Sequence, residues 1–118
     1  MLGDVSGAGQ IFIACGYTDM RKSIDGLAAL VQQNFKMDPF QNNLFLFCGH
    51  KCDRLKALYW EGDGFVLLYR RLEGGRFQWP REAAEVKQIS PHEFRWLLEG
   101  LAIHQSKAVK KVTSSVAI

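Results

Sequence analysis

The chain has no apolar stretch long enough to cross a membrane. Its longest unbroken apolar runs, such as residues 11–15 and 44–48, have five residues, whereas a membrane-spanning helix needs about 20. The first residues also lack a cationic segment followed by a long apolar stretch, so a secretion signal is not indicated. We therefore expect a cytoplasmic protein that makes no contact with a membrane.

Cysteine and proline are scarce, with three of each among 118 residues. An odd number of cysteines fits a reducing compartment better than a disulfide framework. Repeats and low-complexity blocks are absent, and a hydrophobic content of 47% is typical of one globular domain of this length. We expect a flexible, glycine-rich N-terminus at residues 1–10, a single domain at residues 11–100 and a basic, flexible tail at residues 101–118.

The hydrophobic pattern predicts short strands and two helices. Short apolar or alternating runs predict strands at residues 11–15, 44–48, 54–60, 65–72 and 76–79. Apolar residues at helical spacing predict a helix at about 20–35. The sequence SPHE at 90–93 predicts a second helix at about 91–99, because it combines a capping serine, a proline at the first helical position and a glutamate at the third.

The spacing of the strands predicts how they pair. Strands separated by two to four residues must be antiparallel, because a parallel crossover needs a dozen residues or more. The predicted fold is therefore α+β: an antiparallel sheet of about five strands with one helix early and one late. The same periodicities predict the core residues Met20, Ile24, Leu27, Val31, Leu44, Leu46, Leu58, Leu67, Phe94 and Leu97.

The sequence EGDG at residues 61–64 is a strong hairpin signal, because glycine and aspartate tolerate positive φ. If Trp60 pairs with Phe65, then Arg54 lies opposite Arg71 on the same side of the hairpin. This face is apolar near the turn and cationic at its far end.

Two opposed arginines repel each other unless an anion lies between them. A phosphate would meet that requirement for Arg54 and Arg71, and so would a nearby carboxylate such as Glu73. The sequence leaves both alternatives open.

Residues 51–81 are rich in both cations and aromatic rings. Seven cations face four acids there, a net charge of +3, and the cations are Lys51, Arg54, Lys56, Arg70, Arg71, Arg76 and Arg81. The rings include Trp60, Phe65, Tyr69, Phe77 and Trp79. Cations that contact phosphates and rings that stack on exposed bases are what a nucleic-acid surface needs. Composition alone favours a structural interpretation, in which the rings are core and the arginines are solvated.

Arg21 and Lys22 stand in the first turn of the early predicted helix. The helix dipole makes this end positive, so cations there require a compensating negative charge. Asp25, four residues after Arg21, is the favoured internal partner. An external phosphate at the helix N-terminus is the functional alternative.

Metal and catalytic chemistry find little support in the sequence. Cys48, His50 and Cys52 offer three ligands at a spacing that differs from structural zinc sites. The candidate acids have turn or capping roles, and no serine or cysteine has a histidine with an evident triad role. We expect no enzyme activity, no metal, no cofactor and no small-molecule substrate.

Four tracts resemble one bacterial family. They are GYTDMRKSIDGL at 16–27, LYWEGDGF at 58–65, RRLE at 70–73 followed by GRFQWP at 75–80, and LLEGL at 97–101. In this order they are similar to the TnpB accessory proteins, or orf-two-like proteins, of the IS66 insertion sequences, which differ from the RNA-guided nuclease of the same name. The family pattern has no cysteine–histidine cluster at residues 48–52, which further disfavours a metal role.

The resemblance implies a role in bacterial DNA transposition beside a separate transposase that carries the cutting chemistry. The predicted function is a non-catalytic accessory protein that binds nucleic acid. The motif residues predicted to contact DNA are Arg21, Lys22, Arg70, Arg71, Arg76 and Trp79, and the hairpin pairing adds Arg54 and Lys56. The alternative is an adaptor that binds the transposase or a regulator without DNA, with Trp60, Phe65, Phe77 or Trp79 as anchors.

Overall fold

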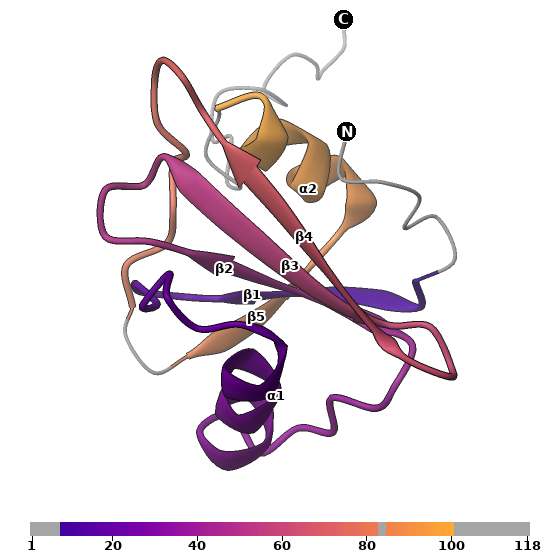
Figure 1. Cartoon of the computed structure of the whole chain (residues 1–118). Coiled ribbons are helices and arrows are strands. Elements are labelled where there is room, and N and C mark those ends of the chain that lie inside the picture. Colours follow the sequence, from indigo (N-terminus) through magenta and orange to yellow (C-terminus); the bar gives the residue numbers. More distant parts are fainter. Residues whose placement is uncertain (1–7, 83–84, 101–118) are drawn as a thin grey trace, which may run out of the picture.

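A computed structural model describes residues 8–82 and 85–100 of the chain (Figure 1). A five-stranded sheet with the order β4-β3-β2-β1-β5 carries two helices. The elements are β1 (Gln10–Ala14), α1 (Ile24–Gln33), β2 (Asn43–Cys48), β3 (Arg54–Trp60), β4 (Phe65–Arg71), β5 (Val86–Ile89) and α2 (Pro91–Leu98). The α+β class and the early and late helices are confirmed. No helix within the described ranges is long and apolar enough to span a bilayer.

The domain ends predicted as flexible fall mostly outside this description. Residues 1–7 and the whole predicted tail, 101–118, lie outside the described residues. Gln10, which the prediction assigned to the N-terminal segment, is the first residue of β1.

The sheet is mixed and not wholly antiparallel. Strands β2, β3 and β4 form an antiparallel meander, but β1 and β2 are parallel, with Ile11 opposite Leu44. The short-connection rule was correct for the meander, where it applies. Residues 15–42 separate β1 from β2 and include α1, so this connection is long enough for a parallel crossover.

The fifth strand is Val86–Ile89 and not residues 76–79. Strand β5 pairs antiparallel with β1 at the sheet edge. The segment 76–79 instead packs its two rings into the core: Phe77 is 2% exposed and Trp79 is 6% exposed. Their alternation with polar residues imitates a strand, but this segment covers the sheet and does not join its ladder.

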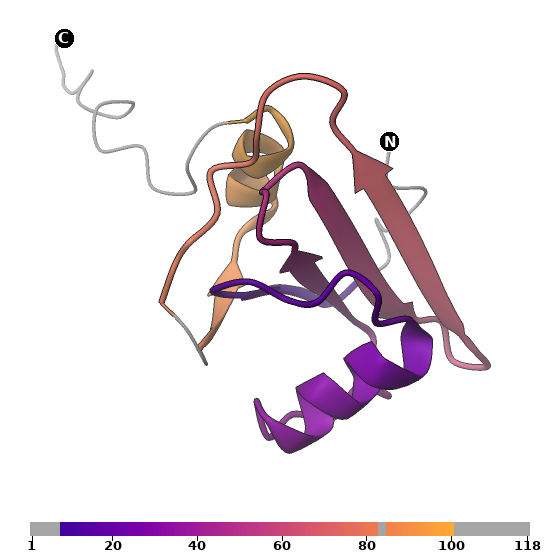
Figure 2. The same ribbon diagram turned by 60° about the vertical axis from the view of Figure 1, so that its left-hand side comes forward.

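Each face of the sheet has its own core, as expected from the alternation of side chains along strands. Helix α1 covers one face through Leu27 and Val31, which pack with Phe45, Phe47 and Leu58. On the other face lie Leu97 of α2 and the two rings of the 76–79 segment. Figure 2 shows the two helices on either side of the sheet. All ten predicted core residues are buried in, or packed against, these two clusters.

The hairpin has the predicted register. Trp60 lies opposite Phe65, and Arg54 lies opposite Arg71. The turn is closed by a hydrogen bond of 2.9 Å from the Glu61 N–H to the Gly64 carbonyl. The predicted capping box of α2 is also present, with reciprocal hydrogen bonds between Ser90 and Glu93.

Gly49, directly after β2, is required by close packing. A Cβ atom there would lie 2.6 Å from Cγ of Met20. We expect Gly49→Ala to destabilise the fold by about 1–3 kcal/mol, because Met20 must move out of a packed position. Urea denaturation measures this loss.

Gly64→Ala is the matched control, since nothing lies within 4 Å of the added methyl group. Met20→Ala introduced into the Gly49→Ala variant should recover part of the loss by removing the clash. Equal stability of the Gly49→Ala and Gly64→Ala variants would contradict the packing account.

Candidate nucleic-acid interface

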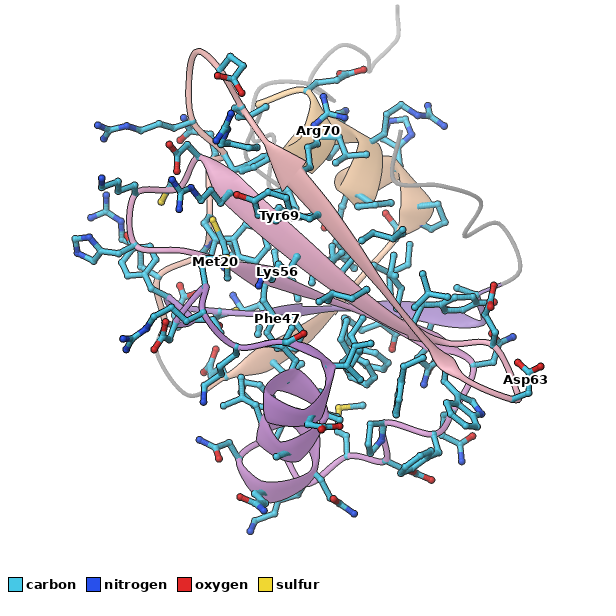
Figure 3. All side chains as sticks on the ribbon, in the orientation of Figure 1. Met20, Phe47, Lys56, Asp63, Tyr69 and Arg70 are labelled. Carbon is cyan, nitrogen blue, oxygen red and sulfur yellow. The ribbon has the colours of Figure 1, made fainter. Side chains whose placement is uncertain are left out.

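Strand alternation divides the predicted DNA-contacting arginines between the two faces of the hairpin. Arg54 and Arg71 are register partners on the face that α1 covers, the face of Leu58. Arg70 is paired with Leu55, so it belongs to the opposite face. Neighbours in sequence therefore serve different surfaces. We call Lys51, Arg54, Tyr69 and Arg71 the basic face; Figure 3 shows Tyr69 and Arg70 on β4.

Arg54 has no directly paired counter-ion among the described residues. It is exposed, and within residues 8–82 and 85–100 its side chain makes no ion pair and no hydrogen bond. Arg71, which pairs with Arg54 across the hairpin, donates a hydrogen bond from Nε to Oε2 of Glu73 at 2.9 Å. This carboxylate raises the pKa of Arg71. Glu73, the carboxylate that the sequence offered as a partner for the opposed arginines, thus pairs with Arg71 and not with Arg54.

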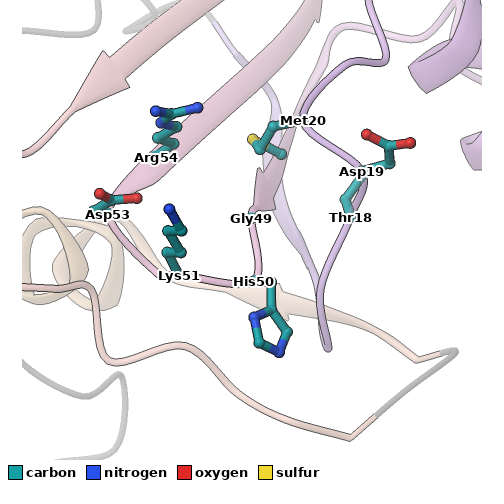
Figure 4. Close-up of a pocket in the computed structure, with 8 residues that line it drawn as sticks. All are labelled: Thr18, Asp19, Met20, Gly49, His50, Lys51, Asp53 and Arg54. Atoms are coloured by element: carbon teal, nitrogen blue, oxygen red, sulfur yellow. The ribbon is translucent and has the colours of Figure 1, made fainter.

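A pocket of about 260 Å³ adjoins Arg54. Figure 4 shows it between the segment around Asp19 and the turn that follows β2. Its lining residues are Thr18, Asp19, Met20, Gly49, His50, Lys51, Asp53 and Arg54. Two cations, Lys51 and Arg54, and two carboxylates, Asp19 and Asp53, line the pocket, so the charge of the pocket is mixed.

Main-chain hydrogen bonds set the shape of the turn between β2 and β3. Cys52 N–H donates to the Gly49 carbonyl at 2.9 Å, and Gly49 N–H donates to the Arg54 carbonyl at 3.2 Å. Cys52 has a φ of 60°, a left-handed conformation that is uncommon outside glycine. This tight turn holds Lys51 and Arg54 at the same end of the hairpin.

Lys56 belongs to the framework and not to the open surface. Its Nζ donates to the carbonyls of Met20 and Lys22, both at 2.7 Å. It also lies 5.9 Å from the ring centroid of Tyr69. The ammonium group therefore fastens the segment before α1 to the middle of β3.

Trp79 is likewise structural. The ring is buried, and its Nε1–H donates to the Ala14 carbonyl at 2.9 Å. It cannot stack on a base without leaving the core. The exposed ring of this region is Tyr69, 52% exposed, which the candidate residues did not include. Its place opposite Lys56 in the predicted register was the signal that could have found it.

Arg21 pairs with a different acid from the one predicted. Its Nη2 lies 2.8 Å from Oδ2 of Asp19, whereas the sequence favoured Asp25 as its partner. The guanidinium and the Arg21 N–H both donate to Asp19, and they hold the pKa of that carboxyl well below its usual range. Helix α1 begins only at Ile24, so Arg21 and Lys22 precede the helix and do not occupy its first turn.

Arg76 is exposed in the connection that follows β4. It precedes Phe77, whose N–H donates to the Cys52 carbonyl at 2.7 Å. Phe77 belongs to the core on the α2 side of the sheet. Arg70, on the opposite face of the hairpin, and Arg76, in the connection after β4, therefore both lie outside the basic face.

Comparison with known proteins gives the family. Residues 9–108 match the family model described as IS66 Orf2 like protein. The chain belongs to the IS66 Orf2-like family. It is 39% identical over 92 residues to the uncharacterized protein y4hO of Sinorhizobium fredii, covering 78% of this chain and 80% of that protein. Identity to the uncharacterized protein y4jC of the same organism is 37%, covering 78% and 79%. No solved structure matches the chain.

Membership of the IS66 Orf2-like family makes the chain an accessory protein of an insertion sequence, from a family that is not known to be catalytic. Two of the tracts that resemble the family meet in the fold. Gly16 N–H donates to the Pro80 carbonyl at 2.8 Å, beside the bond from Trp79 to Ala14. The GRFQWP tract thus connects the end of strand β1 with the core on the α2 side of the sheet.

Cys48, His50 and Cys52 do not form a cluster of metal ligands. Among the described residues, the one group of three or more histidine, cysteine or acidic side chains with ligand atoms within 4.8 Å of one another is Cys15, Glu82 and Glu85. His50 instead packs its ring edge-on to Tyr17, with centroids 5.2 Å apart.

Removal of the Lys56 ammonium should weaken the fold. We expect Lys56→Met to cost about 2 kcal/mol, because the carbonyls of Met20 and Lys22 lose a charged donor. Thermal or urea unfolding measures the change. Lys51→Met is the control, since this exposed lysine has no such partners in the described residues, and a loss as large in that variant would contradict the anchoring role.

The three thiols should differ in reactivity. Burial raises the pKa of Cys15, and burial followed by the neighbouring Cys52 thiol raises the pKa of Cys48. A raised pKa leaves less reactive thiolate at any given pH. We expect iodoacetamide at about pH 8.5 to label Cys52 well before the other two. Mass spectrometry of the labelled peptides would refute this if Cys48 reacted as fast as Cys52.

Proposed function

We propose that this insertion-sequence accessory protein binds nucleic acid through its basic face, beside the transposase of the same element. The observation that carries the proposal is the opposition of Arg54 and Arg71 across the hairpin while the Arg54 side chain has no counter-ion among the described residues. Exposed Tyr69 between them and the turn offers a ring on which an unpaired base can stack.

Electrostatics support an anion at this position. Directly opposed like charges destabilise an antiparallel pair. The Glu73 partner of Arg71 is exposed, and an exposed ion pair contributes at most about 1 kcal/mol. Glu73 therefore compensates one guanidinium weakly and leaves the other. A phosphate placed between Arg54 and Arg71 would compensate both.

The proposed contacts are revised accordingly. Arg54 and Arg71 provide the main phosphate contacts, and Lys51, at the same end of the hairpin, adds a third charge. Arg21 and Lys22 flank this surface, although Arg21 must exchange Asp19 for a phosphate. Arg70 and Arg76 lie outside the basic face and would contact nucleic acid only where it extends past the sheet edge. Lys56 and Trp79 support the site from within.

The alternative function is an adaptor that grips the transposase or a regulator. Phe77 and Trp79, two of its four predicted anchors, are buried and unsuited to that role. Trp60 and Phe65 are partly exposed and lie at the hairpin turn, away from the basic face. A protein contact at the turn is compatible with nucleic acid at the opposite end.

Salt dependence tests the proposal. If about four phosphates are neutralised, affinity for a short DNA should fall on the order of a hundredfold between about 50 and 200 mM salt. Arg54→Gln/Arg71→Gln should lower affinity at low salt by about tenfold and reduce the slope of log affinity against log salt by about 1.8, because two phosphate contacts are lost. Fluorescence anisotropy with single-stranded and duplex DNA measures both quantities.

The control is Lys36→Gln/Lys87→Gln, which removes the same net charge elsewhere. Lys87 is on β5 at the opposite edge of the sheet and pairs with Glu82, much as Arg71 pairs with Glu73. An equal effect of the two double variants would mean that only overall charge matters. Unchanged binding by the Arg54→Gln/Arg71→Gln variant would reject the basic face.

A further inference from the structure

Three aromatic rings gather at the turn of the hairpin. The Phe40 ring lies 5.0 Å from Trp60 and 5.2 Å from Phe65, and Trp60 lies 4.8 Å from Phe65, measured between ring centroids. Trp60 and Phe65 flank the β3–β4 turn, and Phe40 comes from the loop between α1 and β2. We call these three residues the aromatic tip.

The aromatic tip is more exposed than a core cluster. Phe40 is 52% exposed, and neither core cluster includes Phe40 or Trp60. The loop nevertheless holds Phe40 in place. Neighbouring Pro39 is fully buried, and the Asp38 carboxylate accepts hydrogen bonds from the Phe40 N–H at 2.9 Å and from Gln41 Nε2 at 3.1 Å. A large apolar ring is thus presented to solvent on an ordered support.

The sequence segments that carry the aromatic tip are acidic. Residues 37–43 and 57–69 contain three acids, Asp38, Glu61 and Asp63, and no lysine or arginine. All three are exposed, and none forms an ion pair within the described ranges. The hydrogen bonds to Asp38 lower the pKa of its carboxyl, which keeps it ionised at neutral pH. Figure 3 shows Asp63 at the end of the hairpin remote from Arg70.

The exposed rings and the three acids together indicate which kind of partner would bind. Three carboxylates repel the phosphates of nucleic acid, so the aromatic tip is unsuited to DNA. Exposed rings beside carboxylates suit an arginine or lysine, which can lie over a ring while it pairs with an acid. An apolar residue next to that cation would cover Phe40.

We propose that the aromatic tip docks a cationic segment of a partner protein, in which arginine or lysine alternates with apolar residues. The inference rests on the accessory role and not on DNA binding by the basic face. The anchors are Phe40 and Trp60, and Glu61 and Asp63 supply the charge complementarity. The protein then holds nucleic acid at one end of the hairpin and a protein at the other.

Anisotropy of a fluorescein-labelled peptide of alternating arginine and leucine, titrated with the full chain, tests this docking. We expect saturable binding that Phe40→Ser weakens by about tenfold, as for an anchor residue at an interface. Glu61→Gln/Asp63→Asn should weaken it by a similar factor and reduce its salt dependence. A peptide with glutamate in place of arginine should not bind.

Two controls match these variants. Tyr17→Ser removes another exposed ring, 43% exposed, that packs on His50 and not at the aromatic tip. Glu85→Gln/Glu99→Gln removes two exposed acids elsewhere. Neither control should change peptide binding, and the Arg54→Gln/Arg71→Gln variant should retain it in full. That last comparison separates failure of this inference from failure of the proposed DNA contact.

Three results would overturn the inference. One is equal peptide binding by the chain and by the Phe40→Ser variant. Another is loss of DNA affinity, but not of peptide affinity, in Phe40→Ser. The third is self-association of the chain, detected by sedimentation, that Phe40→Ser abolishes, because the occupant would then be a second copy.

Discussion

The register of the β3–β4 hairpin is the constraint on which the functional surfaces depend. Seven consecutive residue pairs, from Arg54 with Arg71 to Trp60 with Phe65, fix which side chains share a face and which end of the hairpin they occupy. A slip of one residue would transfer Leu58 from the α1 core to the opposite face and separate the two arginines. Because the burial of Leu58 favours this register, it also keeps the two arginines opposite each other at the far end of the hairpin.

A second set of contacts supports this hairpin from segments that are distant in sequence. Lys56 fastens the chain before α1 to β3, and Trp79 fastens the segment after β4 to the end of β1. In both cases a polar group on a large side chain meets main-chain carbonyls that a strand or helix would otherwise satisfy. In a basic, aromatic sequence, a lysine or tryptophan with the chemistry of a nucleic-acid contact can thus instead hold two segments of the fold together.

The sequence was sufficient where local rules decide the structure. The EGDG turn determined the hairpin register, and the residues around Ser90 determined the start of α2. It was insufficient where a tertiary contact decides. Strand β5 presents Lys87 and Gln88 to solvent at a sheet edge and has only a weak apolar pattern, so it was not predicted. The parallel β1–β2 pair depends on the placement of α1 across the sheet.

The candidate site was also predictable only in part. Pairing predicted that Arg54 faces Arg71, but burial of Trp79 and the carbonyl partners of Lys56 depend on segments brought together only by folding. Phe40 could not be found from the hairpin sequence, because its loop reaches the aromatic tip from another part of the chain. Its interaction with Asp38 gave only a local turn signal.

The two ends of the hairpin are far enough apart to act independently. Six residue steps along β3 separate Arg54 from Trp60, about 20 Å in an extended strand. This exceeds the Debye length of about 8 Å at physiological salt, so the acids of the tip scarcely reduce the potential at the arginines. A polyanion and a polycation can then occupy opposite ends of one rigid ribbon without neutralising each other. Under the two proposals above, the protein orients a basic protein segment relative to nucleic acid through the length of a single hairpin.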